Sequence, residues 1–343
     1  MCRANKSVRI SFLLSVVAVL IPTKESSAQV QPGDILIYDR GELRAVRQDG
    51  TPVPGFEVSI PNQMEGLATG PGSAIYFTGA GSGTPGSPAG VYRVNPQTGA
   101  ITTITTATSP SADYFRGIAV EPTGSLVVST LDNDILRIDP TTGARTTLVP
   151  AGGFLTYAPF LQVGPDGTIY ASSQNAQGYY IARVNPVTGA QTTVTSGQFF
   201  TALKGFAVAP DNTLYAANVS HASPAPGEEM GQILRIDPAA GHQSVLYTSN
   251  TNPTDVFNPY GIAVDPQGNV LVADQQSSSN DVVDGAVFRF DRLTGARSPV
   301  YAGGRLEQDP QFVAVVVPEP ATISLCLMAG VGVFLRRPRR AAA

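Results

Sequence analysis

The sequence of 343 residues contains no tryptophan, only two cysteines, only two histidines, and 14% charged residues. Both cysteines, Cys2 and Cys326, lie in terminal segments that have the features of targeting signals. We therefore expect neither a disulfide framework nor a thiolate metal site in the folded part. The net charge of -4 provides no basic patch or stripe, so we expect no nucleic-acid partner.

What the sequence does contain is glycine (35) and proline (28), placed between short runs rich in valine, isoleucine, threonine and tyrosine. β-Branched and aromatic runs bounded by turn residues are typical of short strands joined by tight turns. The composition therefore predicts an all-β protein.

The N-terminus has the features of a secretion signal. Arg3, Lys6 and Arg9 precede the apolar stretch 10–21, and small residues follow at 26–28. We expect residues 1–28 to be a signal peptide, handled by the Sec translocon and cleaved by signal peptidase after Ala28. The alternative is a membrane anchor, for which the apolar stretch is short.

The C-terminus has three parts in a fixed order: a proline-rich motif, an apolar run at 321–335, and a basic tail within 336–340. A 15-residue helix spans only about 22 Å, against roughly 30 Å of hydrocarbon, and the positive-inside rule keeps the basic tail cytoplasmic. The motif residues are Val317, Pro318, Glu319 and Pro320, and the tail arginines are Arg336, Arg337, Arg339 and Arg340.

This tail, residues 317–343, resembles the PEP-CTERM sorting signal of Gram-negative bacteria. The resemblance implies that an exosortase cuts near the Pro-Glu-Pro motif. It also implies export through an inner-membrane intermediate, then delivery to the outer surface or the extracellular matrix. The alternative is a single-pass tail anchor that is never cut.

The middle of the chain is repetitive. One strand-like element recurs at spacings of 43 to 56 residues, and it is followed by a Pro-x-Gly turn, a second strand, a third strand, a Thr-Gly-Ala turn and a fourth strand. Four short strands per repeat are the signature of a β-propeller blade. The recurring element begins at Gly66, Gly117, Phe160, Gly205 and Gly261.

A sixth blade is split between the two ends of the repeat region. We predict its second, third and fourth strands at 34–39, 42–47 and 54–60, and its first strand at 312–317. Pairing of these segments would close the ring and hide both edges. We therefore predict a six-bladed β-propeller over residues 30–317, and the pattern resembles NHL-repeat, virginiamycin-lyase-like and gluconolactonase-like propellers.

The two faces of this propeller differ in their loops. The Pro-x-Gly and Thr-Gly-Ala turns share one face and are dictated by backbone geometry. The opposite face carries long, irregular loops, where function is usually found. We expect the binding face there, with the sorting signal leaving from the short-turn face. The long loops are 79–90, 108–116, 221–231, 249–260 and 274–285.

Aromatic residues gather just before several first strands, on the long-loop face. If exposed, they would form stacking platforms for a sugar or peptide; alternatively, they close the channel mouth and pack between blades. These candidates are Tyr114, Phe115, Tyr157, Phe199, Phe200, Phe257 and Tyr260.

The alternative hypothesis is that the long-loop face holds a metal site. The gluconolactonase resemblance implies Glu, Asn and Asp converging on a metal, and Glu65, Asn218 and Asp274 lie near the loop-face ends of strands. The lyase resemblance implies paired histidines, whereas His221 and His242 fall on opposite faces. We expect no cofactor, and calcium or another divalent metal at the loop carboxylates is the alternative.

We therefore expect an exported, surface-sorted propeller that acts as a binding or scaffold protein in the extracellular matrix or cell envelope. Its expected partners are an exosortase and an extracellular polysaccharide or surface protein. The alternative function is a metal-dependent lyase or lactonase with its site at the channel mouth, because one fold hosts both roles.

Overall fold

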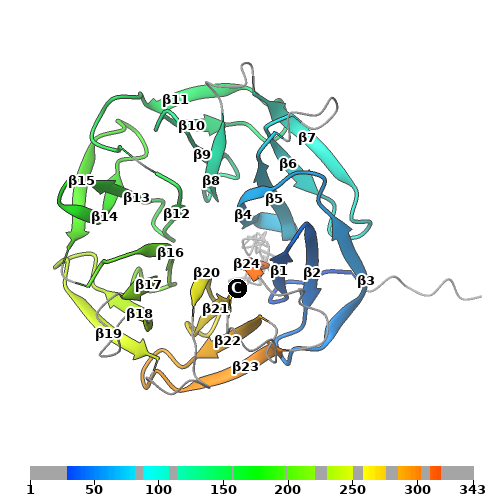
Figure 1. Cartoon of the computed structure of the whole chain (residues 1–343). Coiled ribbons are helices and arrows are strands. Elements are labelled where there is room, and N and C mark those ends of the chain that lie inside the picture. Colours follow the sequence, from blue (N-terminus) through cyan, green and yellow to red (C-terminus); the bar gives the residue numbers. More distant parts are fainter. Residues whose placement is uncertain are drawn as a thin grey trace, which may run out of the picture.

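The computed structural model describes residues 29–81, 88–107, 114–156, 158–197, 199–220, 230–249, 258–275, 285–302 and 310–317. Within them, 24 strands form six four-stranded antiparallel sheets around a central channel (Figure 1). The predicted all-β six-bladed propeller is confirmed. Among the described residues, no helix has the length and apolarity needed to cross a bilayer.

Each sheet is one blade, numbered here in chain order, with its first strand at the channel and its fourth at the rim (Figure 1). Blade 1 contains β24 (Pro310–Val315), β1 (Ile35–Asp39), β2 (Glu42–Val46) and β3 (Pro52–Ser59). Blade 2 contains β4 (Met64–Gly70), β5 (Ala74–Gly79), β6 (Gly90–Val94) and β7 (Ile101–Thr106), with a 3-10 turn at Pro71–Ser73. Blade 3 contains β8 (Phe115–Val120), β9 (Leu126–Thr130), β10 (Ile135–Ile138) and β11 (Arg145–Val149).

Blades 4 to 6 repeat this plan. Blade 4 contains β12 (Leu161–Val163), β13 (Ile169–Asn175), β14 (Gly178–Val184) and β15 (Gln191–Ser196). Blade 5 contains β16 (Leu203–Val208), β17 (Leu214–Ser220), β18 (Met230–Ile236) and β19 (Gln243–Thr248). Blade 6 contains β20 (Pro259–Val264), β21 (Val270–Asp274), β22 (Ala286–Phe290) and β23 (Arg297–Ala302).

The ring is closed by β24, which pairs antiparallel with β1 as the innermost strand of blade 1. Beyond the strand, Val316 N–H donates to the Asp34 carbonyl, and Gly33 N–H donates back to the Val316 carbonyl, both at 2.8 Å. The split blade predicted from the sequence is confirmed. All strands described here lie within residues 29–317, so a chain of these residues alone retains the closed ring.

The core is distributed over the blade interfaces. Six clusters of buried apolar side chains are present among the described residues, and each joins two neighbouring blades. Second strands such as β1, β5 and β9 are buried along their whole length because they pack on both faces. The outer strand β7 is largely threonine and partly exposed. Apolar area buried between blades is therefore the main stabilising contribution.

The recurring Thr-Gly-Ala turn has a side-chain cause. In blade 3, Asp139 Oδ1 accepts hydrogen bonds from the N–H groups of Thr141 (2.7 Å) and Thr142 (2.9 Å). Gly143 then adopts a φ of +71°, which glycine tolerates without a Cβ clash. Asn95 replaces the aspartate in blade 2 and makes the same bonds, so the turn requires an oxygen acceptor and not a charge.

An arginine on the third strand recurs in five blades and links neighbouring blades in three of them. Arg137 and Arg183 donate to the carbonyls of Pro186 (2.7 Å) and Pro238 (3.2 Å) in the following blade. Their counterpart in blade 6 is Arg289, which bridges the last blade to the first. In these three blades the recurring arginine therefore holds neighbouring blades together.

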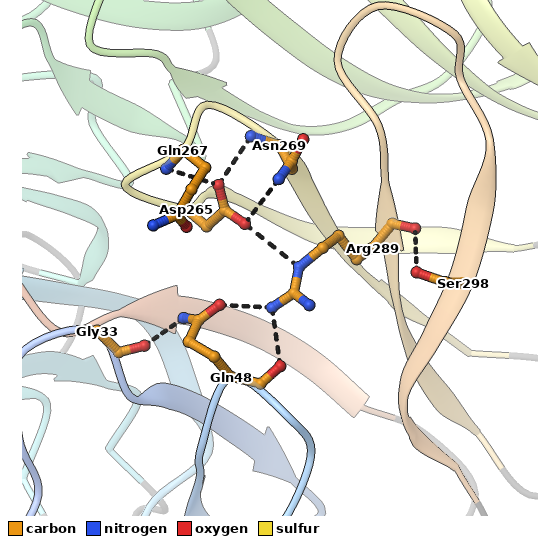
Figure 2. Close-up of polar contacts among 7 residues, drawn as sticks. All are labelled: Gly33, Gln48, Asp265, Gln267, Asn269, Arg289 and Ser298. Atoms are coloured by element: carbon orange, nitrogen blue, oxygen red, sulfur yellow. Dashed lines mark hydrogen bonds and ion pairs between the residues drawn. The ribbon is translucent and has the colours of Figure 1, made fainter.

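Figure 2 shows this closing junction. Arg289 donates to the carbonyl (3.1 Å) and side-chain oxygens of Gln48 in blade 1, and its Nε lies 3.2 Å from Asp265 Oδ2 in blade 6. Asp265 is buried and also accepts hydrogen bonds from the N–H groups of Gln267 and Asn269. The junction thus combines a half-buried cation with a buried, well-bonded carboxylate.

Candidate functional site

The channel contains two adjoining cavities. The upper cavity, about 50 Å³, opens on the long-loop face. The lower chamber, about 460 Å³, opens on the short-turn face and is lined by all six first strands, by the turns that follow five of them, and by Val316 and Val317 after β24. The two cavities share a waist of five residues: Leu67, Ile118, Gln162, Ile262 and Val313.

The rim of the upper cavity is formed by the residue that precedes the repeat glycine, or its replacement, in each blade. We call these six residues the collar: Glu65, Arg116, Pro159, Lys204, Tyr260 and Gln311. All but Arg116 line the upper cavity. The next three positions are glycine in four of the six blades, a large apolar residue in all six and alanine in five, whereas no two collar residues are the same. The collar is therefore where the sixfold repeat gives way to an asymmetric surface.

Glu65 is the only carboxylate among the described residues that line the upper cavity. The Tyr114 hydroxyl donates to Glu65 Oε1 at 3.0 Å. Burial raises the pKa of Glu65 above its usual value, although this hydrogen bond and nearby Arg116 oppose the rise. Burial and the adjacent Glu65 charge raise the pKa of Tyr114 to about 12, so its hydroxyl remains a donor.

The opposite side of the collar carries a cation and an aromatic ring. Lys204 Nζ lies 5.9 Å from the centroid of the Tyr260 ring, within the range of a cation–π contact. The ammonium makes no ion pair with any described residue, and the Gln311 amide makes no hydrogen bond with one. Lys204 and Tyr260 therefore offer a positive charge and an aromatic face to a ligand, and Gln311, in the blade next to that of Glu65, adds an amide.

The aromatic residues predicted for the ligand face divide into three groups. Phe115 and Phe200 are buried in blade interfaces and offer no stacking surface, and Phe199 packs beside Phe200. Tyr114 and Tyr260 are half-buried at the mouth. Tyr157 and Phe257 lie outside the described residues.

The three residues weighed as metal ligands are placed differently from one another. Glu65 lines the mouth, whereas neither Asn218 nor Asp274 lines either cavity. Asn218 is buried and holds the loop backbone, accepting from Thr201 N–H (3.1 Å) and donating to the Phe199 carbonyl (2.9 Å). Buried Asp274 accepts from Asn258 N–H at 2.7 Å. No group of three or more His, Cys, Asp or Glu comes together within the described part of the chain.

Of the targeting residues, only Val317 is described. It lines the lower chamber on the short-turn face, beside the repeat prolines. Outside the described residues lie Ala28, Pro318, Glu319, Pro320, Arg336, Arg337, Arg339 and Arg340.

The sequence interpretation missed Lys204, Gln311 and Gln162. The first two differ from their counterparts in every other blade, so no shared motif marks them. A signal was nevertheless present, because aligning the repeats on their glycines isolates one column that never repeats. Gln162 shows up in the same way, as the one glutamine where other blades have alanine.

The sequence matches no protein-family profile and no curated protein. Its fold is similar to that of TolB from Acinetobacter baumannii, at 14% identity and a TM-score of 0.61, covering 84% of this chain and 67% of that one. It is also similar to a gluconolactonase from Xanthomonas campestris (18% identity, 83% and 86% covered, TM-score 0.52). A catalytically inactive virginiamycin B lyase from Staphylococcus aureus gives 16% identity, 84% and 90% coverage, and a TM-score of 0.53. At these identities the likeness shows the propeller fold, which serves both binding proteins and enzymes.

Proposed function

We propose that this chain is an exported, surface-sorted propeller that acts as a binding protein in the extracellular matrix or cell envelope, with the collar as its binding site. The observation that carries the proposal is the asymmetry of the collar. A structural position would repeat with the blades, as the large apolar residue two positions further on does, whereas a recognition surface requires different groups at different points.

The size and charge of the mouth favour binding over enclosure of a small substrate. Pockets that enclose small molecules usually measure about 300–1,000 Å³, and the upper cavity is about 50 Å³. It suits one projecting group of a larger ligand. Among the described residues that line the mouth, Lys204 supplies a cation without an ion-pair partner and Tyr260 adds an aromatic face, whereas Glu65 already accepts from Tyr114. A polysaccharide that presents carboxylate-bearing sugars meets these groups.

The sorting part of the proposal rests on the sequence of residues 317–343. Closing strand β24 runs toward the short-turn face, and Val317 lies there beside the lower chamber. A tail that continues from this point would hold the short-turn face toward the membrane and present the collar outward. An uncut tail would give the same orientation, so orientation and cleavage need separate tests.

Binding is tested with residues 29–317 on acidic and neutral matrix polysaccharides, measured by pull-down and titration. We expect the Lys204→Gln, Tyr260→Ala double variant to bind the acidic polymer about tenfold or more weakly, because a charge and a stacking face are both lost. The matched control is Arg235→Gln, which removes one exposed cation away from the mouth. Equal binding by the wild type and the double variant would contradict the collar as the site.

Sorting is tested by mass spectrometry of the C-terminus in matching hosts with and without an exosortase. We expect surface material to end near residues 317–320 only in the host that has the protease. Surface material that retains residues up to 343 in both hosts would refute the cleavage.

A further inference from the structure

The lower chamber is a second cavity, on the face opposite the collar. Its walls carry a valine from each of five blades, Val120, Val163, Val208, Val264 and Val315, and its volume of about 460 Å³ lies within the range of small-molecule sites. Water in such an apolar space has few hydrogen-bond partners, so displacing it with apolar groups is favourable.

Four polar side chains line this chamber, and three of them are satisfied by the protein. Glu121 accepts two hydrogen bonds from Arg137, each at 2.7 Å. Asp265 pairs with Arg289 (Figure 2), and Thr69 donates to the Val315 carbonyl at 2.6 Å. The chamber therefore contains no uncompensated charge and suits an uncharged ligand.

The fourth polar side chain is Gln162. It lies at the waist, lines both cavities, and makes no hydrogen bond with any described residue. Strand register fixes its repeat position, because Gln162 pairs with Tyr170 as Ala207 pairs with Tyr215. The equivalent residues in the five other blades are all alanine: Ala68, Ala119, Ala207, Ala263 and Ala314. One blade alone thus places a free amide at the inner end of an apolar chamber.

We infer that the lower chamber binds an uncharged, mainly apolar small molecule that carries one amide, which pairs with Gln162. The Gln162 side chain offers one carbonyl oxygen and two N–H donors, so a ligand amide satisfies it in both directions. An ester offers an acceptor only. The valine walls accommodate the apolar remainder. This site is separate from the collar, and each can fail without the other.

The test uses residues 29–317 and the uncharged fluorescent probe N-phenyl-1-naphthylamine, displaced by octanamide or by the similarly sized methyl octanoate. We expect the probe to bind and octanamide to displace it about fivefold more tightly than the ester, which corresponds to one net hydrogen bond. In Gln162→Ala, which restores the residue of the other blades, we expect probe binding to persist and the amide preference to disappear.

Two further variants locate the probe. Val208→Trp, or Val264→Trp if the first does not fold, fills the chamber and should abolish probe binding while thermal melting confirms a folded chain. Lys204→Gln at the collar should leave probe binding unchanged. Lack of probe binding by the wild type, or an amide-to-ester ratio that is the same in wild type and Gln162→Ala, would overturn the inference.

Discussion

Replacing Arg289 with methionine should weaken the junction at which the propeller ring closes. The substitution removes the hydrogen bonds to Gln48 across the junction and the contact with Asp265, whose side chain is only 1% exposed (Figure 2). Loss of one partner of a buried ion pair costs about 3–5 kcal/mol. Because Arg289 keeps 24% exposure and Asp265 retains backbone donors, we expect about 2–4 kcal/mol here.

The assay is urea denaturation and thermal melting of residues 29–317. With unfolding entropy proportional to chain length, the melting temperature should fall by about 3–7 °C. Arg235→Met is the matched control, since Arg235 holds the same repeat position in blade 5 but is exposed. We expect it to change stability by less than about 0.5 kcal/mol. Equal effects of the two substitutions would refute the assigned role of the closing junction.

Three further predictions concern single positions. The turn hydrogen bonds lower the pKa of Asp139. The stability that this carboxylate contributes is therefore present above the unfolded pKa of about 3.9 and is lost as the pH falls further. Asp139→Asn should reduce the difference in melting temperature between pH 7 and pH 3. Burial raises the pKa of Glu65, so its charged form opposes folding above an unfolded pKa of about 4.3, and Glu65→Gln should raise the melting temperature more at pH 7 than at pH 4. A Cβ on Gly261 would lie 2.7 Å from the Gln311 carbonyl oxygen of the closing strand, so Gly261→Ala should lower the free energy of unfolding by about 1–3 kcal/mol. A Cβ on Gly153 would lie 3.6 Å from its nearest neighbour, the Pro150 carbonyl oxygen, so Gly153→Ala should be nearly neutral in the same melts.

The fold was readable from the sequence because each blade repeats its turn chemistry. Asn95 and Asp139 occur at the same place ahead of a Thr-Gly-Ala turn, and the side-chain oxygen of each makes the same backbone hydrogen bonds. Closure was readable for a related reason. Segment 34–39 begins a blade that lacks a first strand, and 312–317 has the missing pattern, so the observed pairing of β1 with β24 follows.

The candidate site was harder to predict from the sequence, because its residues do not follow the repeat pattern. Phe115 and Phe200 lie at or just before the start of first strands, close in sequence to the mouth residues, yet both are buried between blades. Strand alternation alone does not say which neighbouring residue reaches the channel, since a bulge in the first strand shifts the register there. Lys204 and Gln311 are far apart in the sequence, and only the convergence of the six first strands on one axis brings both into the lining of the same cavity.

The sequence also could not predict whether the residues considered as metal ligands come together. Glu65 and Asn218 both lie near the loop-face ends of strands, and the sequence gives no distance between them. In the structure, the Asn218 amide is engaged by its own loop, whereas Glu65 reaches the channel mouth. Proximity to a strand end identifies the correct face but not the side chains that point to the axis.

We propose that the loop-face mouth binds a ligand through the collar and that it is not a metal-dependent active site. The most direct measurement is elemental analysis of purified residues 29–317, combined with thermal melts in calcium and in chelator. We expect no stoichiometric ion and no shift of the melting temperature between the two conditions. A stoichiometric ion whose removal lowers the melting temperature would contradict it and would favour a metal-dependent lyase or lactonase.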